Sequence, residues 1–365
     1  MKNRYLIMAV AVLLVAAFAL GGCGGGEKKA AEPEKMKVAF VYVGPVGDAG
    51  WSYAHDQGRK YLMDKMPDVQ TTIVESVPEG ADAERVITQL AEQGNKVIFT
   101  TSFGYMDPTI NVAKKYPNVV FMHCSGFKAA QNVGTYFGRI EQARYLTGIA
   151  AAKATQSNVI GYVAAFPIPE VVRGINGFTQ GVRSVNPNAK VKVVWTNTWY
   201  DPAKEKQAAM SLLDAGADVI AQHQDTPGPM QAAEEKGKFG VGYNTDMSKM
   251  APKAVLTSAI WNWGPYYVKV IDAVKKGTWK SEQYWGSMGD GIVDIAPLGP
   301  MVKDDTKKLI EDAKAKIVKG ELDIFAGPIN DQSGQVKVPA GQKVSDADQL
   351  GFNWFVEGVE GTMPK

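Results

Sequence analysis

The stretch from Gly44 to Gly58 constrains the fold of this chain more than any other part of the sequence. It follows an apolar run, Val38–Val43, contains several glycines, and leads into residues 59–63, which have helical spacing. An apolar run, a glycine-rich loop and a helix in this order predict the opening unit of a parallel α/β sheet. Ligands of such sheets bind beyond the carboxyl ends of the strands. The loop is therefore the first candidate for a binding site.

Asp48 and Trp51 are the chemically distinctive residues of this loop. Asp48 offers hydrogen-bond acceptors, and Trp51 offers a large flat apolar ring close to them in the sequence. This pairing suits a small planar ligand with a polar edge. A second interpretation is that Asp48 caps the first helix and that Trp51 packs against it. The sequence leaves both interpretations open.

The N-terminus has the pattern of a secretory signal. Lys2 and Arg4 precede an uncharged stretch, and small residues lead to Cys23, an arrangement that resembles a bacterial lipobox. We expect residues 1–22 to be a lipoprotein signal peptide and Cys23 to be lipidated. Residues 23–35 are rich in glycine and then in charge, which predicts a flexible tether. The protein is thus expected to be exported and anchored at the cell envelope, on the periplasmic side or the outer face of the cell membrane.

Charge and cysteine content exclude several classes of protein. Removing residues 1–22 takes away Lys2 and Arg4 and no acidic residue, so 38 basic and 38 acidic residues remain. A net charge of zero gives no reason to expect a nucleic-acid partner. With Cys23 lipidated, Cys124 has no cysteine to pair with, so burial must hold the fold together.

After the first unit, short apolar runs alternate with helical segments of about ten to fifteen residues as far as Tyr243. Such alternation predicts parallel sheets with right-handed crossovers, and its length suits two sheets better than one. We expect an N-terminal lobe of residues 36–140 plus 258–288 and a C-terminal lobe of residues 141–257 plus 289–365. Two lobes joined by several chain crossings would form a hinged clamp.

Aromatic and polar side chains follow the predicted strands, where a ligand would bind. Ser102, Glu170, Tyr243 and Asn244 are among the residues in these loops. The residues that we expect to contact the ligand are Asp48, Trp51, Phe103, Tyr105, His123, Ser125, Phe166, Trp199, Asp225, Asp246, Trp261 and Asn262. A cleft with such a lining can stack a planar group and hydrogen-bond its rim.

Sequence signatures of catalysis are missing from the chain. It has no G-x-x-x-x-G-K-[ST] phosphate loop, no G-x-G-x-x-G fingerprint and no G-x-S-x-G elbow. His55, His123 and His223 lack the spacing of a zinc site. We therefore expect a binding protein rather than an enzyme, with no metal and no cofactor.

Several segments resemble the basic membrane protein family, the substrate-binding lipoproteins of ABC importers, which include purine nucleoside receptors. The resemblance covers about residues 37–334. It rests on the lipobox, Gly47–Trp51, Glu141–Ala152, Asp214–Ile220 and Leu256–Ser258. It implies an α/β fold of the periplasmic-binding-protein type I, with two Rossmann-like lobes of parallel strands joined by a multi-crossing hinge. It also implies an ABC permease and ATPase complex as partner.

The resemblance further implies ligand contacts at Asp48, Trp51 and Asp246. The nucleoside receptors carry acidic residues that hold the ribose where this chain has His123–Gly126, and a lysine where it has Trp261–Trp263. These departures favour a free purine base over a nucleoside, with adenine as the first candidate. A nucleoside, a flavin or another flat heterocycle remains the alternative ligand. A ligand-sensing partner of a membrane signalling protein remains the alternative role.

Overall fold

A computed structural model describes residues 35–364 of the chain. The expected signal peptide lies outside the described residues, and so do Cys23 and the tether up to residue 34. Residues from Met36 onward form a separate compact unit. No helix of the described part is long and apolar enough to cross a membrane.

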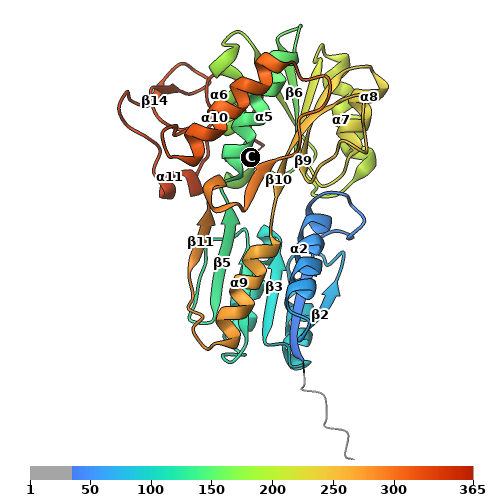
Figure 1. Ribbon diagram of the computed structural model, residues 1–365, viewed down its shortest axis with the longest axis vertical. Coiled ribbons are helices and arrows are strands. Elements are labelled where there is room, and N and C mark those ends of the chain that lie inside the picture. Colours follow the sequence, from blue (N-terminus) through green and yellow to red (C-terminus); the bar gives the residue numbers. More distant parts are fainter. Residues whose placement is uncertain (1–34, 365) are drawn as a thin grey trace, which may run out of the picture. The chain divides into compact units, whose positions relative to one another are not determined.

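The N-terminal lobe contains a six-stranded, wholly parallel sheet in the order β11-β5-β4-β3-β1-β2 (Figure 1). Its strands are β1 Met36–Tyr42, β2 Val69–Val74, β3 Val97–Thr101, β4 Val120–Cys124, β5 Val133–Gly138 and β11 Gln283–Gly286. Helices α2 Trp51–Lys65 and α9 Gly264–Lys275 pack on one face, and α3 Ala81–Glu92 and α4 Met106–Ala113 on the other. The short turn η1 Phe103–Tyr105 precedes α4.

Alternation along β1 explains these two layers. Val38, Phe40 and Tyr42 belong to the core under α2 and α9, whereas Ala39 and Val41 belong to the core under α3 and α4. Successive side chains of a strand point to opposite faces, so a strand that is apolar throughout is buried on both sides.

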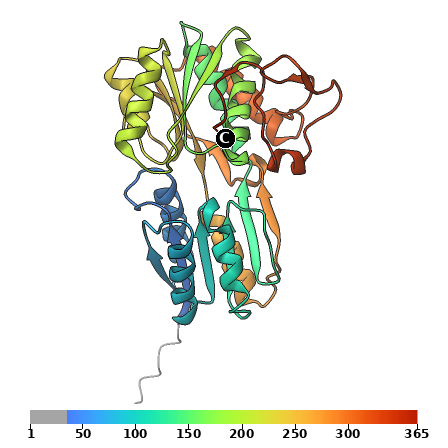
Figure 2. The ribbon, with the colours of Figure 1, turned by 180° about the vertical axis from the view of Figure 1, so that it is seen from behind.

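The C-terminal lobe contains a seven-stranded sheet in the order β12-β10-β9-β8-β6-β7-β15, in which β12 is antiparallel to β10. Its strands are β6 Val159–Ala164, β7 Lys190–Trp195, β8 Val219–His223, β9 Phe239–Asn244, β10 Val255–Trp261, β12 Val293–Ile295 and β15 Val359–Glu360. Its helices are α5 Ile140–Ala154, α6 Pro169–Val185, α7 Pro202–Asp214, α8 Gly228–Glu235 and α10 Asp304–Val318. Helices α7 and α8 lie on one face, and α5, α6 and α10 lie on the other (Figure 2).

The segment that follows α10 lies beside α6. It contains the hairpin β13 Ile329–Asn330 and β14 Val336–Val338, and the short helix α11 Asp346–Leu350. Asn176 of α6 donates a hydrogen bond to the carbonyl of Trp354 and accepts one from the amide of Val356. These bonds attach the segment to the C-terminal lobe.

The chain passes between the two sheets three times in the described residues: from β5 to α5, from β10 to α9, and from β11 through η2 Met288–Asp290 to β12. The second passage comes after Trp261, not after Ser258 as the sequence indicated. Ser258, Ala259 and Ile260 pair with β9 and therefore belong to the C-terminal sheet.

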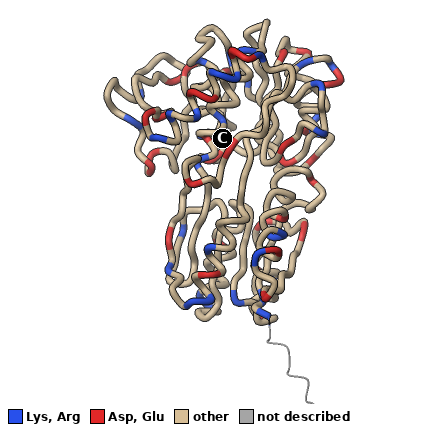
Figure 3. The backbone as a smooth tube through the Cα atoms, in the orientation of Figure 1, with Lys and Arg blue, Asp and Glu red and all other residues tan. Residues whose placement is uncertain are grey.

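Acidic and basic residues are interspersed over both lobes (Figure 3). Most ion pairs of the described residues are exposed, such as the one between Lys236 and Asp214. Exposed pairs of this kind contribute about 0 to 1 kcal/mol each, so apolar burial dominates the stability of the fold.

Candidate functional site

A small cavity lies between the two lobes, beyond the carboxyl ends of β1, β3 and β4 on one side and of β6, β7, β8 and β9 on the other. It is lined by Val43, Trp51, Ser102, Phe103, Ser125, Glu170, Trp199, His223, Asp225 and Tyr243. Its volume is about 20 Å³, which is room for about one water molecule. A planar heterocycle therefore requires the lining side chains or the lobes to separate.

Aromatic rings from both lobes form the apolar part of the lining. Phe103 and Trp51 come from the N-terminal lobe, and Trp199 and Tyr243 come from the C-terminal lobe. The ring of Trp199 packs against that of Phe166, with their centroids 5.1 Å apart. Rings presented from two lobes can enclose the two faces of a planar ligand.

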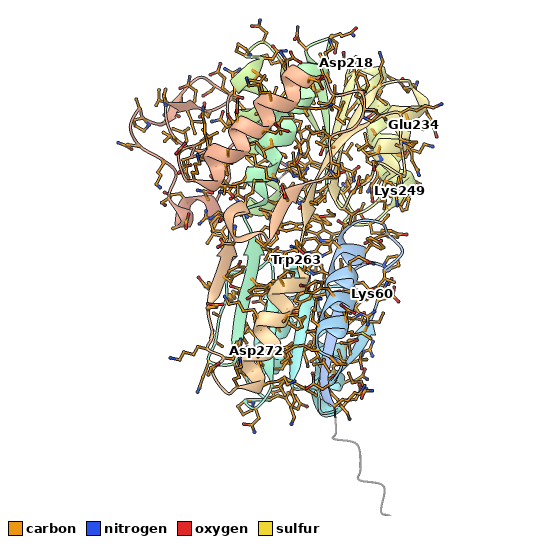
Figure 4. All side chains as sticks on the ribbon, in the orientation of Figure 1. Lys60, Asp218, Glu234, Lys249, Trp263 and Asp272 are labelled. Atoms are coloured by element: carbon orange, nitrogen blue, oxygen red, sulfur yellow. The ribbon has the colours of Figure 1, made fainter. Side chains whose placement is uncertain are left out.

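Trp51 is held by a hydrogen bond and by a cluster of rings. Its indole N–H donates to the carbonyl oxygen of Thr101 at 2.7 Å. Its ring meets the edges of His55, Trp261 and Trp263 at centroid distances of 4.3, 5.7 and 5.8 Å. Figure 4 shows Trp263 at the junction of the lobes. Trp51 therefore supports the fold and also lines the cavity.

Two carboxylates form the acidic part of the lining. Asp225 is 4% exposed and accepts a hydrogen bond of 3.3 Å from Asn244. Burial raises its pKa well above the usual value, and the neighbouring carboxylates of Asp48 and Glu205 raise it further. Glu170 lies in the first turn of α6 and is 9% exposed.

His223 is a neutral histidine in contact with Glu170. Burial lowers its pKa to about 4, although the carboxylate of Glu170 acts in the opposite direction. The Nε2 atom lies 3.5 Å from Oε1 of Glu170 and 3.3 Å from the hydroxyl of Tyr243. Neutral imidazole has one donor and one acceptor, so His223 places no positive charge beside Glu170 at neutral pH.

Gly50 lies at a close approach between the two lobes. A Cβ atom on Gly50 would lie 2.2 Å from the carbonyl oxygen of Asp225, at the opposite side of the cavity. Backbone therefore meets backbone here, and the absence of a side chain on Gly50 permits the contact.

Asp48 takes the structural role that the sequence left open. Its carboxylate accepts hydrogen bonds from the backbone amides of Gly50, Ser52 and Tyr53 at 2.8 to 2.9 Å. Burial raises its pKa to about 6 despite these bonds. The carboxylate thus serves the N-terminus of α2 and does not line the cavity.

Five of the twelve predicted residues line the cavity: Trp51, Phe103, Ser125, Trp199 and Asp225. Besides Asp48, six others do not. The hydroxyl of Tyr105 donates to the carbonyl of Val77 in the core under α3 and α4, and Nδ1 of His123 lies 3.1 Å from the hydroxyl of Thr100. Phe166 does not line the cavity itself, but its ring packs against that of Trp199, which does.

The last three lie at the ends of β9 and β10. Asp246 is exposed, and its carboxylate accepts a hydrogen bond from the amide of Ser248. Trp261 donates its indole N–H to Asn244 at 2.9 Å and stacks on Trp263, whereas Asn262 is exposed and donates to the carbonyl of Gly291. The polar groups of all three are thus engaged outside the cavity.

Other lining residues were not among the twelve. Ser102 and Glu170 follow strands and Tyr243 is the last residue but one of β9, so their position at strand ends was a signal that could have identified them. His223 was missed because the apolar run Val219–Ala221 predicts a strand that ends at Ala221, whereas β8 continues to His223 and brings its side chain to the cavity. In residues 35–364, no group of three or more His, Cys, Asp or Glu residues is placed to hold a metal ion.

A protein-family model described as "ABC transporter substrate-binding protein PnrA-like" matches residues 35–326. A purine-binding protein of Brucella abortus is 48% identical over 97% of this chain and 99% of its own length. A putative ABC transporter glucose-binding protein of Haloferax volcanii is 41% identical over 93% of this chain and 84% of its own length.

Solved structures show the same fold at low sequence identity. A solute-binding protein of an ABC transporter system from Aeropyrum pernix superimposes with a TM-score of 0.71, at 20% identity, over 80% of this chain and 94% of that one. One from Conexibacter woesei has a TM-score of 0.63, at 23% identity, over 79% and 98%. The periplasmic-binding-protein type I fold expected from the sequence is confirmed.

Proposed function

Because the chain belongs to the Bmp family of PnrA-like ABC transporter substrate-binding proteins, we propose that it captures a purine-type ligand between its lobes, with adenine as the first candidate. The observation that carries the proposal is the cavity itself, in which aromatic rings from both lobes stand beside the carboxylates of Glu170 and Asp225. Rings suit the faces of a purine, and carboxylates accept hydrogen bonds from its N–H groups. The similarity to the Brucella purine-binding protein supports this ligand class.

The chain is a solute-binding protein of an ABC transporter and not an enzyme, as its family and the similar structures show. Its task is to hold the ligand unchanged and to present it to a membrane transporter. A planar ligand entering the cavity would separate the rings and bring Glu170 and Asp225 to its rim. A nucleoside, flavin or other flat heterocycle remains the alternative ligand, because a cavity of about 20 Å³ requires the lobes to separate for a ligand of any of these sizes.

One of the two reasons that the sequence offered for a base over a nucleoside does not apply in the structure. Trp261 and Trp263 do not line the cavity, so they do not take up the volume of a sugar. The ribose itself remains as the reason to prefer a base. A buried ribose would need partners for its hydroxyls, because an unmatched buried polar group costs about 1 to 3 kcal/mol.

Adenine is therefore expected to bind at least about tenfold more tightly than adenosine, a difference of about 1.4 kcal/mol. Calorimetric titration of both ligands would measure this, with protein that has been unfolded and refolded to remove co-purified ligand. Glucose serves as the control, because the Haloferax relative is described as glucose-binding. Equal or reversed affinities of adenine and adenosine would refute the preference for a base. Binding of glucose alone would refute the purine assignment.

Delivery to an ABC permease and ATPase complex follows from the family, and anchoring through a lipid on Cys23 is part of the proposal. With Cys23→Ser, the protein is expected to move from the membrane fraction to the soluble envelope fraction or the medium, because a thiol is needed for acylation. Membrane association that persists in the variant would contradict lipid anchoring.

A role as sensing partner of a signalling protein would be favoured if ligand uptake did not depend on this protein.

A further inference from the structure

Glu170 touches both lobes at the cavity. Its Oε2 atom accepts a hydrogen bond from the hydroxyl of Ser125, which follows β4 in the N-terminal lobe. Its Oε1 atom faces Nε2 of His223 in the C-terminal lobe at 3.5 Å. The side chain belongs to α6 and lines the cavity together with both partners. The carboxylate is thus positioned where a ligand would bridge the lobes.

The chemistry of this carboxylate limits what a ligand can place opposite it. An ionised carboxylate accepts hydrogen bonds and donates none, and its two oxygens offer about four acceptor positions. The hydroxyl of Ser125 occupies one of them. A ligand N–H can take the place of that hydroxyl, whereas a ligand carbonyl would bring a second acceptor against the carboxylate. Such a mismatch between polar groups is a strong basis for discrimination.

The surroundings of Glu170 leave its charge without an ionic partner in the cavity. The pKa of His223 is lowered to about 4 by burial, so the imidazole is neutral at pH 7. The guanidinium of Arg144 lies over the ring of Tyr243, 3.6 Å from the ring centroid, and donates to the carbonyl of Gln222 at 2.6 Å. Arg144 does not line the cavity. Acceptor positions on the two oxygens of Glu170 therefore remain for a donor on the ligand.

We propose that Glu170 is the specificity-determining residue of the cavity: it accepts a hydrogen bond from the exocyclic amino group of a 6-aminopurine, in place of the hydroxyl of Ser125, and rejects purines with a carbonyl at that position. This inference rests on the proposed function, namely that the ligand is a purine. Glu170 is not among the twelve residues that the sequence predicted to contact the ligand. The inference gives it the discrimination between amino and oxo purines.

Glu170→Gln tests the assignment, because the amide keeps the shape of the side chain and can donate to a carbonyl. Adenine carries an amino group at C6 and an acceptor at N1, whereas hypoxanthine carries a carbonyl at C6 and a proton on N1. Both are titrated into refolded wild-type protein and variant. The wild type is expected to prefer adenine. In the variant, the ratio of the two affinities is expected to shift toward hypoxanthine by at least about tenfold. Adenine loses a charge-assisted hydrogen bond from its amino group, and hypoxanthine is freed from the repulsion between its carbonyl and the carboxylate.

Two further variants serve as comparisons. Asp218 lies at the far end of the same lobe (Figure 4) and accepts hydrogen bonds from Thr155, Gln156 and Ser157. Asp218→Asn removes a hydrogen-bonded carboxylate away from the cavity and is expected to leave the ratio unchanged. Asp225→Asn removes the other carboxylate of the cavity. A ratio that responds to Asp225→Asn and not to Glu170→Gln would overturn the assignment.

The outcomes separate the inference from the proposed function. Wild-type protein that binds neither purine would refute the proposed function. Wild-type protein that binds adenine, with an unchanged ratio in a folded Glu170→Gln variant, would refute only the inference. Thermal unfolding of each variant shows whether it is folded. If Glu170→Gln does not fold, Glu170→Asp is used instead, because it keeps the charge on a shorter side chain. The inference then stands only if Glu170→Asp weakens adenine binding more than Asp218→Asn does.

Discussion

Replacing Trp51 by alanine is expected to lower the free energy of unfolding by about 3 to 5 kcal/mol in the absence of ligand. The indole is 8% exposed, packs among His55, Trp261 and Trp263, and donates its N–H to the carbonyl of Thr101. The substitution removes this packing and leaves a buried carbonyl without that donor. Denaturant unfolding of ligand-free protein, followed by circular dichroism, measures the change.

Ligand binding should also weaken in this variant, because Trp51 lines the cavity. Base–aromatic stacking is worth about 1 to 3 kcal/mol by alanine substitution, which corresponds to a loss of affinity of roughly 5- to 150-fold. Trp199→Ala is the matched comparison, because Trp199 lines the same cavity but is only partly buried. It should cost less stability than Trp51→Ala. A Trp51→Ala variant of unchanged stability would contradict the supporting role of this residue.

Replacing Arg173 by methionine is expected to lower the free energy of unfolding by about 3 to 5 kcal/mol as well, because it leaves a buried charge without its partner. Arg173 and Glu141 are 3% and 2% exposed, and Nε of the arginine lies 3.3 Å from Oε2 of the glutamate. The guanidinium also donates to the carbonyl of Gln349 and lies over the ring of Trp285 in the N-terminal sheet.

The pH dependence of this loss identifies its cause. Burial raises the pKa of Glu141, and Arg173 acts to lower it, so removing the arginine raises the pKa of the folded state further. A folded-state pKa above the unfolded value means that the folded state binds the proton more tightly, so stability falls as the pH rises through the folded pKa. The deficit of Arg173→Met relative to wild type should therefore be smaller at pH 5 than at pH 8.

Lys236→Met is the control for this prediction, because it breaks an exposed ion pair with Asp214. Its expected cost is about 0 to 1 kcal/mol. A double variant that also replaces Glu141 by leucine should recover part of the stability lost in Arg173→Met, since no buried charge then remains unpaired. If the Arg173 and Lys236 variants lost the same free energy of unfolding, the buried ion pair would contribute no more to stability than the exposed one.

The sequence predicts the two-lobe fold well because alternating apolar runs and helical segments form a long-range pattern. The strands that the sequence pattern did not indicate are β5 and those that follow Tyr243, namely β10, β11, β12, β13, β14 and β15. Two glycines, Gly134 and Gly138, interrupt the apolar character of β5, and β11 contains four residues. Both lie at one side of the N-terminal sheet, where pairing with a distant segment defines the strand and local sequence does not.

The site is harder to predict than the fold for a physical reason. Strand order places the loops at one edge of each sheet, but the hydrogen bonds inside a loop decide which side chains face the ligand. Asp48 and Asp246 follow strands as required, yet both carboxylates accept hydrogen bonds from nearby backbone amides, those of Gly50 and Ser52 for Asp48 and that of Ser248 for Asp246. Short polar side chains commonly bond to nearby backbone in this way. The cavity-lining role of His223 likewise depends on where β8 ends.

The contact between Gly50 and the backbone of Asp225 has a consequence for how the sequence can vary. A methyl group at position 50 would meet a carbonyl oxygen at 2.2 Å, whereas one at Gly47, in the same loop, would have no atom within 4 Å. In a library of variants selected for growth on a scavenged ligand, alanine should thus be accepted at position 47 and depleted at position 50. Two glycines of the same loop, three residues apart, would then differ in their tolerance to substitution.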